Sequence, residues 1–100
     1  MDPEQSDLTI ADVVVSTAGR DAGSLFYVLE ADDIYLLLAD GKGRRIEKPK
    51  RKKRKHASKV LRSETRVAEK LRNGDKVLNS ELRRYLAYLS RELQSKALGG

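Results

Sequence analysis

Residues 13–28 read VVVSTAGRDAGSLFYV, and this stretch decides which fold the chain can adopt. Three β-branched valines open it and a run rich in aromatic and β-forming residues closes it, so both ends favour strands. Residues 18–24 lie between them and hold two glycines, four positions apart, with Arg20 in the interval. Glycine permits a left-handed backbone and the close approach of another chain. The stretch therefore predicts two strands joined by a loop that is open to contact.

The strand pattern continues on the C-terminal side. Residues 25–29 and 34–39 are apolar runs, and the aspartate pair 32–33 between them supplies a turn. The Asp-Gly pair at 40–41 is a strong signal for a tight hairpin turn. Short strands joined by short turns predict a small all-β barrel.

The remaining strands are harder to place. A fourth strand is expected around Ile46, the apolar anchor among Arg44, Arg45, Glu47 and Lys48. Pro49 cannot donate to a strand ladder and marks an edge, a bulge or an exit. We expect the basic run 50–55 to be mobile and residues 60–61 to add a last strand that closes the barrel.

The final third of the chain changes to a helical period. The Ser-Glu pair at 63–64 can start a short helix that Asn73 and Gly74 end. Asn79 or Ser80 is expected to cap a second helix. Its apolar positions are spaced three and four apart. They are Leu82, Tyr85, Leu86, Leu89 and Leu93.

Charge is strongly segregated along the sequence. Residues 1–40 carry a net charge of −8, residues 41–60 a net charge of +10 and residues 61–100 a net charge of +4. Such segregation makes a strong local field. An acidic segment would repel a polyanion, so we expect any polyanion to dock on the face presented by residues 42–59.

The composition excludes several classes of site. Without cysteine, the chain can form no disulfide, thiolate metal site or cysteine nucleophile. No apolar run approaches the roughly 20 residues of a membrane span. The polar, acidic residues 1–5 do not have the pattern of a signal peptide. We therefore expect a cytoplasmic protein.

Catalytic motifs are missing as well. His56 is the only histidine, and no acidic or nucleophilic partner lies close to it in the sequence. Asp32 and Asp33 are adjacent on a turn, so their carboxylates point apart. Residues 41–43 lack the rest of a phosphate-binding loop pattern. We expect no enzyme, no metal site, no cofactor and no small-molecule substrate.

The basic segment is the main candidate for binding. Eleven cationic side chains lie between Lys42 and Lys59, and each could displace counterions from a phosphate. A solvated basic segment or a nuclear-localisation patch is the alternative. The segment contains no aromatic residue, so we expect contact with the backbone of structured RNA rather than base stacking. The candidate RNA-binding residues are Gly19, Arg20, Gly23, Lys42, Arg44, Arg45, Lys48, Lys50, Arg51, Lys52, Lys53, Arg54, Lys55, His56 and Lys59.

The stretch 13–28 resembles a KOW motif, which places hydrophobic residues on both sides of a loop with spaced glycines and a basic residue. The similarity continues through residues 36–41 and the basic segment to His56. Over residues 10–62 the chain is similar to the ribosomal protein family called L-fourteen-e and to small bacterial KOW proteins like it. One glycine often found before the first strand is replaced by Ala11 or Asp12.

The resemblance implies an SH3-like β-barrel that binds RNA, usually ribosomal RNA. It implies that Gly19 and Gly23 shape the loop and that Arg20 contacts RNA or braces the loop. The side chains it places along the RNA-facing side are Lys42, Arg44, Arg45 and Lys48. The expected fold class is mainly β, with a leader over residues 1–9, an SH3-like barrel over 10–62 and a helical extension over 63–100.

Three functions remain open. The first is binding of ribosomal RNA on the large subunit. The second is a protein-interaction module of the transcription machinery, since KOW barrels also occur in elongation factors and the leucine stripe must cover either its own barrel or a partner. That stripe consists of Leu82, Leu86, Leu89 and Leu93. The third is non-specific DNA binding, which a competition between duplex RNA and duplex DNA would separate from the first.

Overall fold

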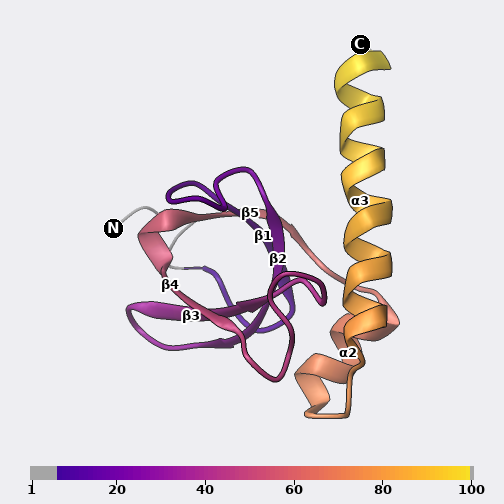
Figure 1. Ribbon diagram of the computed structural model, residues 1–100. Helices are drawn as coiled ribbons and strands as arrows, with labels where there is room; N and C mark the ends of the chain where they lie inside the picture. The colour runs from indigo at the N-terminus through magenta and orange to yellow at the C-terminus, as the bar shows by residue number, and fades with distance from the viewer. Residues whose placement is uncertain (1–6, 100) are drawn as a thin grey trace.

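The computed structural model describes residues 7–99, which form a five-stranded antiparallel sheet and two α-helices (Figure 1). The strand order is β4-β3-β2-β1-β5, so β4 and β5 are the two edges and do not pair with each other. A 3-10 turn, η1, carries the chain from one edge strand to the other. The elements are β1 (Asp12–Ser16), β2 (Leu25–Ala31), β3 (Tyr35–Ala39), β4 (Lys50–Lys53), η1 (Arg54–His56), β5 (Ala57–Arg62), α2 (Arg66–Asn73) and α3 (Asn79–Gly99).

The central strands are buried on both faces, which explains why their sequences run apolar without alternation. Val14 and Phe26 pack into one core, on the side of the sheet that also holds Leu8. Val13 and Tyr27 point to the other side and pack into a second core with the helices. Because neighbouring residues on a strand face opposite ways, one apolar run serves two cores.

Two irregularities in the ladders accompany the curl of the sheet. The register of β1 against β5 shifts between Val13 and Val14. The register of β2 against β3 shifts between Val28 and Glu30. An extra residue on one strand bends it and increases its twist. These shifts allow the sheet to curve around the core that contains Val14 and Phe26.

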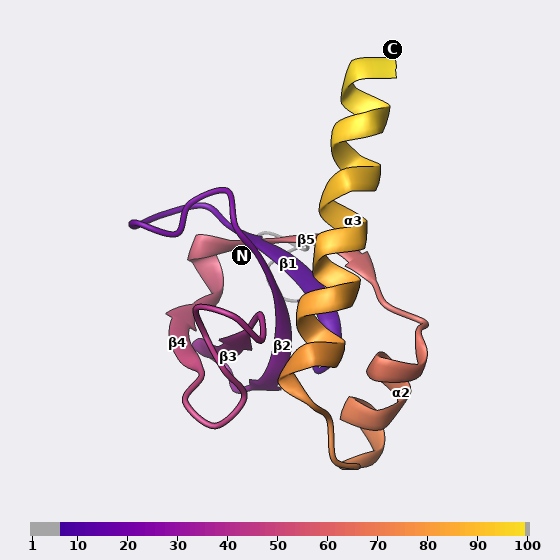
Figure 2. The same ribbon diagram turned by 45° about the vertical axis from the view of Figure 1, so that its right-hand side comes forward.

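Helix α3 covers the outer face of the sheet along part of its length and then projects beyond it (Figures 1 and 2). Leu82, Leu86 and Leu89 are buried there, against Val13 and Tyr27. Three of the four leucines of the stripe therefore pack on the chain's own sheet, the first of the two alternatives raised by the sequence. The fourth, Leu93, stays 39% exposed.

The strands expected from the first three apolar runs and from residues 60–61 are confirmed, but the expected fourth strand is wrong. Residues 40–49 form an irregular loop instead. The Asp40 carboxylate accepts hydrogen bonds from the backbone N–H groups of Lys42 and Arg44, which curls the chain after Gly41. The N–H of Ile46 then donates to the side chain of Asn79 rather than to a strand. The Asp-Gly pair thus starts a loop that docks on α3.

The prediction that the basic run 50–55 is mobile is also wrong. Lys50–Lys53 is strand β4, which pairs with β3 along its whole length, and Arg54–His56 is η1. Pro49 lies just before the strand, where it does not interrupt the ladder. The fourth strand is therefore the basic run itself.

The start of the first helix and the N-terminal leader agree less closely with what the sequence predicts. Helix α2 starts after Thr65, two residues beyond the start expected at Ser63, because the Thr65 hydroxyl accepts from the N–H of Ala68. Ser63 is buried and contacts the hydroxyl of Tyr27 instead. The leader expected over residues 1–9 lies mostly outside the described residues, and within its described part Leu8 is buried in the core.

The docking of the 40–49 loop on α3 can be tested at Gly41. A Cβ there would lie 2.1 Å from the carbonyl oxygen of Asn79, and its φ of 77° disfavours other residues. We expect Gly41→Ala to destabilise the fold by more than the roughly 1–2 kcal/mol of a left-handed backbone alone. Gly23→Ala is the matched control, since its φ is 90° and its Cβ would meet nothing within 4 Å. Equal losses of unfolding free energy in urea would show that this contact is not tight.

Candidate nucleic-acid interface

The centre of the candidate site is a lysine that does not face solvent. The Lys52 side chain is only 7% exposed, and its Nζ donates to the Asp21 carboxylate at 2.6 Å and to the carbonyl oxygen of Ala18 at 2.7 Å. The Ser16 hydroxyl accepts a third hydrogen bond. A buried ammonium costs several kcal/mol unless it is fully paired, and three acceptors satisfy its three donors. This cluster fastens β4 to the β1–β2 loop.

Strand alternation sorts the rest of β4 by side. Lys50 lies two residues before Lys52 and reaches the other oxygen of Asp21, at 2.9 Å. Arg51 and Lys53 therefore face the opposite way, and both are exposed. One carboxylate thus anchors two of the lysines of β4 and leaves the other two cations of the strand, Arg51 and Lys53, available to a ligand.

The ionisation of Asp21 follows from the same geometry. Burial opposes its negative charge and would raise its pKa, but hydrogen bonds from Lys52, Lys50 and Ser16 outweigh burial. The pKa of Asp21 is therefore held well below its usual value of 3.8. The carboxylate stays charged at all ordinary pH values and keeps the lysines paired.

The β1–β2 loop holds the three loop candidates named from the sequence. The N–H of Gly23 donates to the carbonyl of Ser16, which closes the loop at its base, and Gly19 lies beside the Lys52–Asp21 pair. Arg20 is exposed. The glycines thus shape a loop whose base is fixed to β4, while the Arg20 side chain remains at the surface.

An aromatic ring lies beneath one of the exposed cations. The guanidinium carbon of Arg51 stands 4.0 Å from the centroid of the Tyr35 ring on β3. A cation–π contact of this kind attracts the guanidinium to the face of the ring and so restricts the positions of the Arg51 side chain. Tyr35 is half-buried, and its contact with Arg51 depends on the pairing of β3 with β4, so this supporting role was not visible in the sequence.

The β3–β4 loop supplies the other exposed cations and lies beside β4 (Figures 1 and 2). Arg45 pairs with Glu47 at 3.6 Å, and both side chains are about two-thirds exposed. Glu47 also accepts from the side-chain amide of Asn79, which is the first cause of its lowered pKa. Asn79 thereby braces the loop from the start of α3. We call the following set the basic face: Lys42, Arg44, Arg45, Lys48, Arg51 and Lys53.

A shallow hollow joins the two loops to α3. Lys42 and Arg83 line it together with Gly23, and Arg83 also donates to the carbonyl of Gly41 at 3.4 Å. Arg83 was not among the candidate residues named from the sequence. The contact of Arg83 with Gly41 depends on the docking of α3, which local sequence patterns do not reveal.

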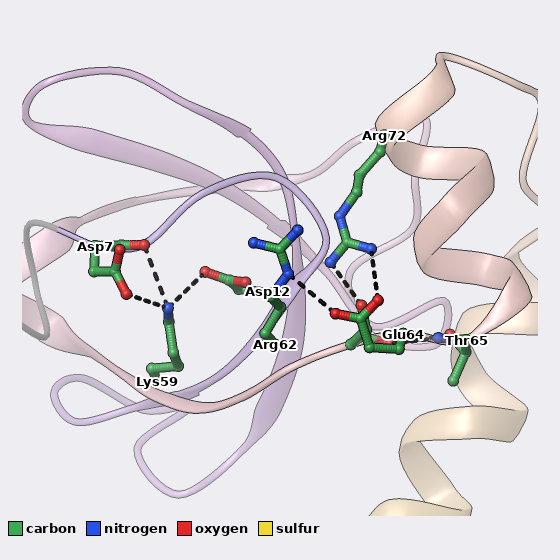
Figure 3. A network of polar contacts seen from close by, with 8 residues as sticks. Asp7, Asp12, Lys59, Arg62, Glu64, Thr65 and Arg72 are labelled. Carbon is green, nitrogen blue, oxygen red and sulfur yellow. Dashed lines mark hydrogen bonds and ion pairs between the residues drawn. The ribbon is translucent and has the colours of Figure 1, made fainter.

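Other candidates from the basic run are used inside the fold. Lys59 pairs with Asp7 at 2.8 Å and Asp12 at 3.4 Å (Figure 3). Its pKa is raised, first by the hydrogen bond to Asp7. Arg54 donates to the carbonyl oxygens of Asp32 and Leu8. These two cations lie at η1 and β5, beyond the end of β4, and hold chain segments together.

The last two candidates, Lys55 and His56, lie in η1 between the edge strands. Lys55 is exposed and His56 is half-buried. They continue the basic run past β4, but they belong to neither the basic face nor the Lys52 cluster.

No protein-family model and no curated protein matches the chain. Across residues 7–99, neither helix combines the length and apolar character that a membrane crossing requires.

The Lys52 cluster consists of Lys52, Ser16, Ala18 and Asp21. It makes the free energy of unfolding depend on pH. Because the folded pKa of Asp21 lies below 3.8, its stabilising contribution is complete above that pH and is lost as the pH falls below it. We expect Asp21→Asn to lower the free energy of unfolding by roughly 2–3 kcal/mol at pH 7. The difference from the native chain should shrink below pH 3.8 in urea titrations.

Asp33→Asn is the matched control, because the Asp33 side chain is exposed at the β2–β3 turn. It should change stability by less than about 0.5 kcal/mol. A loss for Asp21→Asn that is equally small, or that is independent of pH, would contradict a structural role for the cluster.

Proposed function

We propose that this chain is an RNA-binding protein of the KOW type whose partner is ribosomal RNA on the large ribosomal subunit, in the cytoplasm. The observation that carries the proposal is the Lys52–Asp21 pair, which fastens the β1–β2 loop to β4. Asp21 engages Lys50 and Lys52 inside the fold, and the strand then holds the exposed Arg51 and Lys53 at a fixed spacing. Cations held in place can match a phosphate backbone without losing side-chain and loop freedom on binding.

The strand arrangement supports the finer proposal of an SH3-like barrel. The two edges of the sheet, β4 and β5, are joined by the three residues of η1. A connection so short keeps the two edges near each other at that end. The sheet also curls around the core that contains Val14 and Phe26, which includes residues from β1, β2, β3 and β5.

Electrostatics favour a polyanion over a protein partner. The basic face carries six cations within twelve residues, and Glu47 is the only acid in that interval. The competing interface, the leucine stripe of α3, is mostly covered by the sheet. We therefore favour RNA binding over a protein-interaction module that uses this stripe.

The contact is proposed to follow the RNA backbone. Arg51 and the loop arginines can make bidentate bonds to phosphate. Tyr35, the aromatic ring beside them, lies under Arg51 and does not offer an open stacking surface. A protein that reads backbone and shape prefers structured RNA, where the 2′-hydroxyl and groove geometry distinguish it from DNA.

The basic face can be tested by removing two charges from it. We expect Arg51→Gln with Lys53→Gln to weaken binding to a ribosomal RNA fragment and to flatten the dependence of log K on log salt by about 1.5, since each lost phosphate contact removes roughly 0.7–0.9. Fluorescence anisotropy at several salt concentrations measures both effects.

The control variant removes two exposed cations from elsewhere on the molecule, Arg62→Gln with Arg66→Gln. It makes the same change in net charge and should alter the salt slope far less. Equal effects of the two pairs would mean that only net charge matters. Equal affinity for duplex RNA and duplex DNA would favour the non-specific DNA alternative.

The cellular partner can be tested by sedimentation. In a sucrose gradient of lysate at low salt, the protein should migrate with the large ribosomal subunit, and raising the salt should release it because phosphate contacts are salt-dependent. The variant with Arg51→Gln and Lys53→Gln should dissociate at a lower salt concentration. A position at the top of the gradient under all conditions would rule out the ribosomal partner.

A further inference from the structure

A second surface, on the helices, combines aromatic and basic side chains. The groove lies between α2 and α3, which pack at the opposite side of the molecule from β4 (Figures 1 and 2). Its lining residues are Val67, Glu81, Arg84, Tyr85, Tyr88 and Arg91.

Tyr88 is the most unusual member of this groove. Its side chain is 52% exposed, although a tyrosine ring is a large apolar surface. The ring lies 6.2 Å from the ring of Tyr85, measured between centroids and with an angle of 41° between planes. Tyr85 in turn contacts the buried Tyr27 ring at 5.9 Å. Tyr88 is thus held by a row of rings while leaving much of its own surface open.

The charges around this ring are arranged for an anion. Arg84 and Arg91 are exposed and stand one helical turn before and one turn after Tyr88, so they lie on the same face of α3. The acid in the groove, Glu81, is already engaged. It pairs with Lys70 at 3.0 Å and accepts from the N–H of Leu78 at 3.1 Å, at the start of α3.

We propose that this groove binds one unpaired nucleotide of an RNA strand, with the base stacked on Tyr88 and the flanking phosphates contacted by Arg84 and Arg91. Stacking on an aromatic ring beside basic residues is the common means of holding single-stranded nucleic acid. A peptide or a second protein could use the aromatic rings, but two arginines flanking an open ring fit a base between two phosphates better.

This inference rests on the proposed function, because it assigns a second RNA contact to the same protein. It also extends that function. The basic face addresses structured RNA through β4 and the β3–β4 loop, and the groove between α2 and α3 addresses an unpaired nucleotide. A protein with both contacts would bind a junction or bulge in which a duplex and a single-stranded nucleotide occur together.

The experiment uses a short unstructured RNA, an oligouridine of eight nucleotides, and a blunt RNA hairpin without unpaired residues outside its loop. The chain has no tryptophan and four tyrosines, so tyrosine emission reports binding near any of these rings, and the Tyr88→Ala variant separates the groove from Tyr35 on β3. We expect the oligouridine to quench this emission and Tyr88→Ala to weaken its binding by about tenfold, the size expected for the loss of one stacked base.

Two further variants separate the contributions to this site. Tyr88→Phe should keep nearly full affinity for oligouridine, because phenylalanine preserves the stacking ring. Arg84→Gln with Arg91→Gln should weaken oligouridine binding and reduce its salt dependence. Since Tyr88 is exposed, we expect Tyr88→Ala to leave the melting temperature close to that of the native chain.

The outcomes distinguish this inference from the proposed function. Oligouridine binding that depends on Tyr88 supports the groove even if the hairpin does not bind. Hairpin binding that depends on Arg51 and Lys53, together with oligouridine binding that is absent or unchanged by Tyr88→Ala, overturns the groove and leaves the basic face intact. Loss of both ligands in Arg51→Gln with Lys53→Gln, but of neither in Tyr88→Ala, also overturns it.

Discussion

The ion pair between Lys52 and Asp21 is the constraint on which the rest of the structure depends. It joins an edge strand to a loop 31 residues earlier in the chain, where a lysine among apolar residues would otherwise be costly. Because Lys52 points inward, its neighbours on β4 must point outward. The same bond that closes the scaffold therefore determines which cations face a ligand. Fold and binding surface are two consequences of one buried contact.

The sequence suggested that the acidic N-terminal part repels a polyanion, but in the fold some of its acids have a structural role. Three acids of the N-terminal part form ion pairs with lysines of the basic segment. Asp21 pairs with Lys50 and Lys52, and Asp7 and Asp12 pair with Lys59. Opposite charges that are distant in the sequence thus meet in space and hold β4 and β5 to the N-terminal segments. The basic face consists of cations left over after this pairing, together with the exposed Arg45.

The sequence predicted the parts of the fold that local chemistry controls. Apolar runs located β1, β2 and β3, and the left-handed Gly74 ended α2 as expected. The fourth strand was misplaced because a run of lysines and arginines does not predict a strand. The run becomes β4 because it pairs with β3 and because Asp21 accepts hydrogen bonds from its lysines. The division of the basic run into scaffold and surface was also invisible, since it depends on where Asp21 lies in space. Tyr35 and Arg83 were missed because their contacts depend on the pairing of β3 with β4 and on the docking of α3.

The most direct test of this division is the chemical reactivity of individual lysines. Acetylation of the free protein and of the protein bound to the large ribosomal subunit, read by mass spectrometry, measures each side chain separately. We expect Lys42, Lys48 and Lys53 to react in the free protein and to be protected in the complex, whereas Lys52 should react in neither. Ready acetylation of Lys52 in the folded free protein, or unchanged reactivity of Lys42, Lys48 and Lys53 on binding, would contradict it.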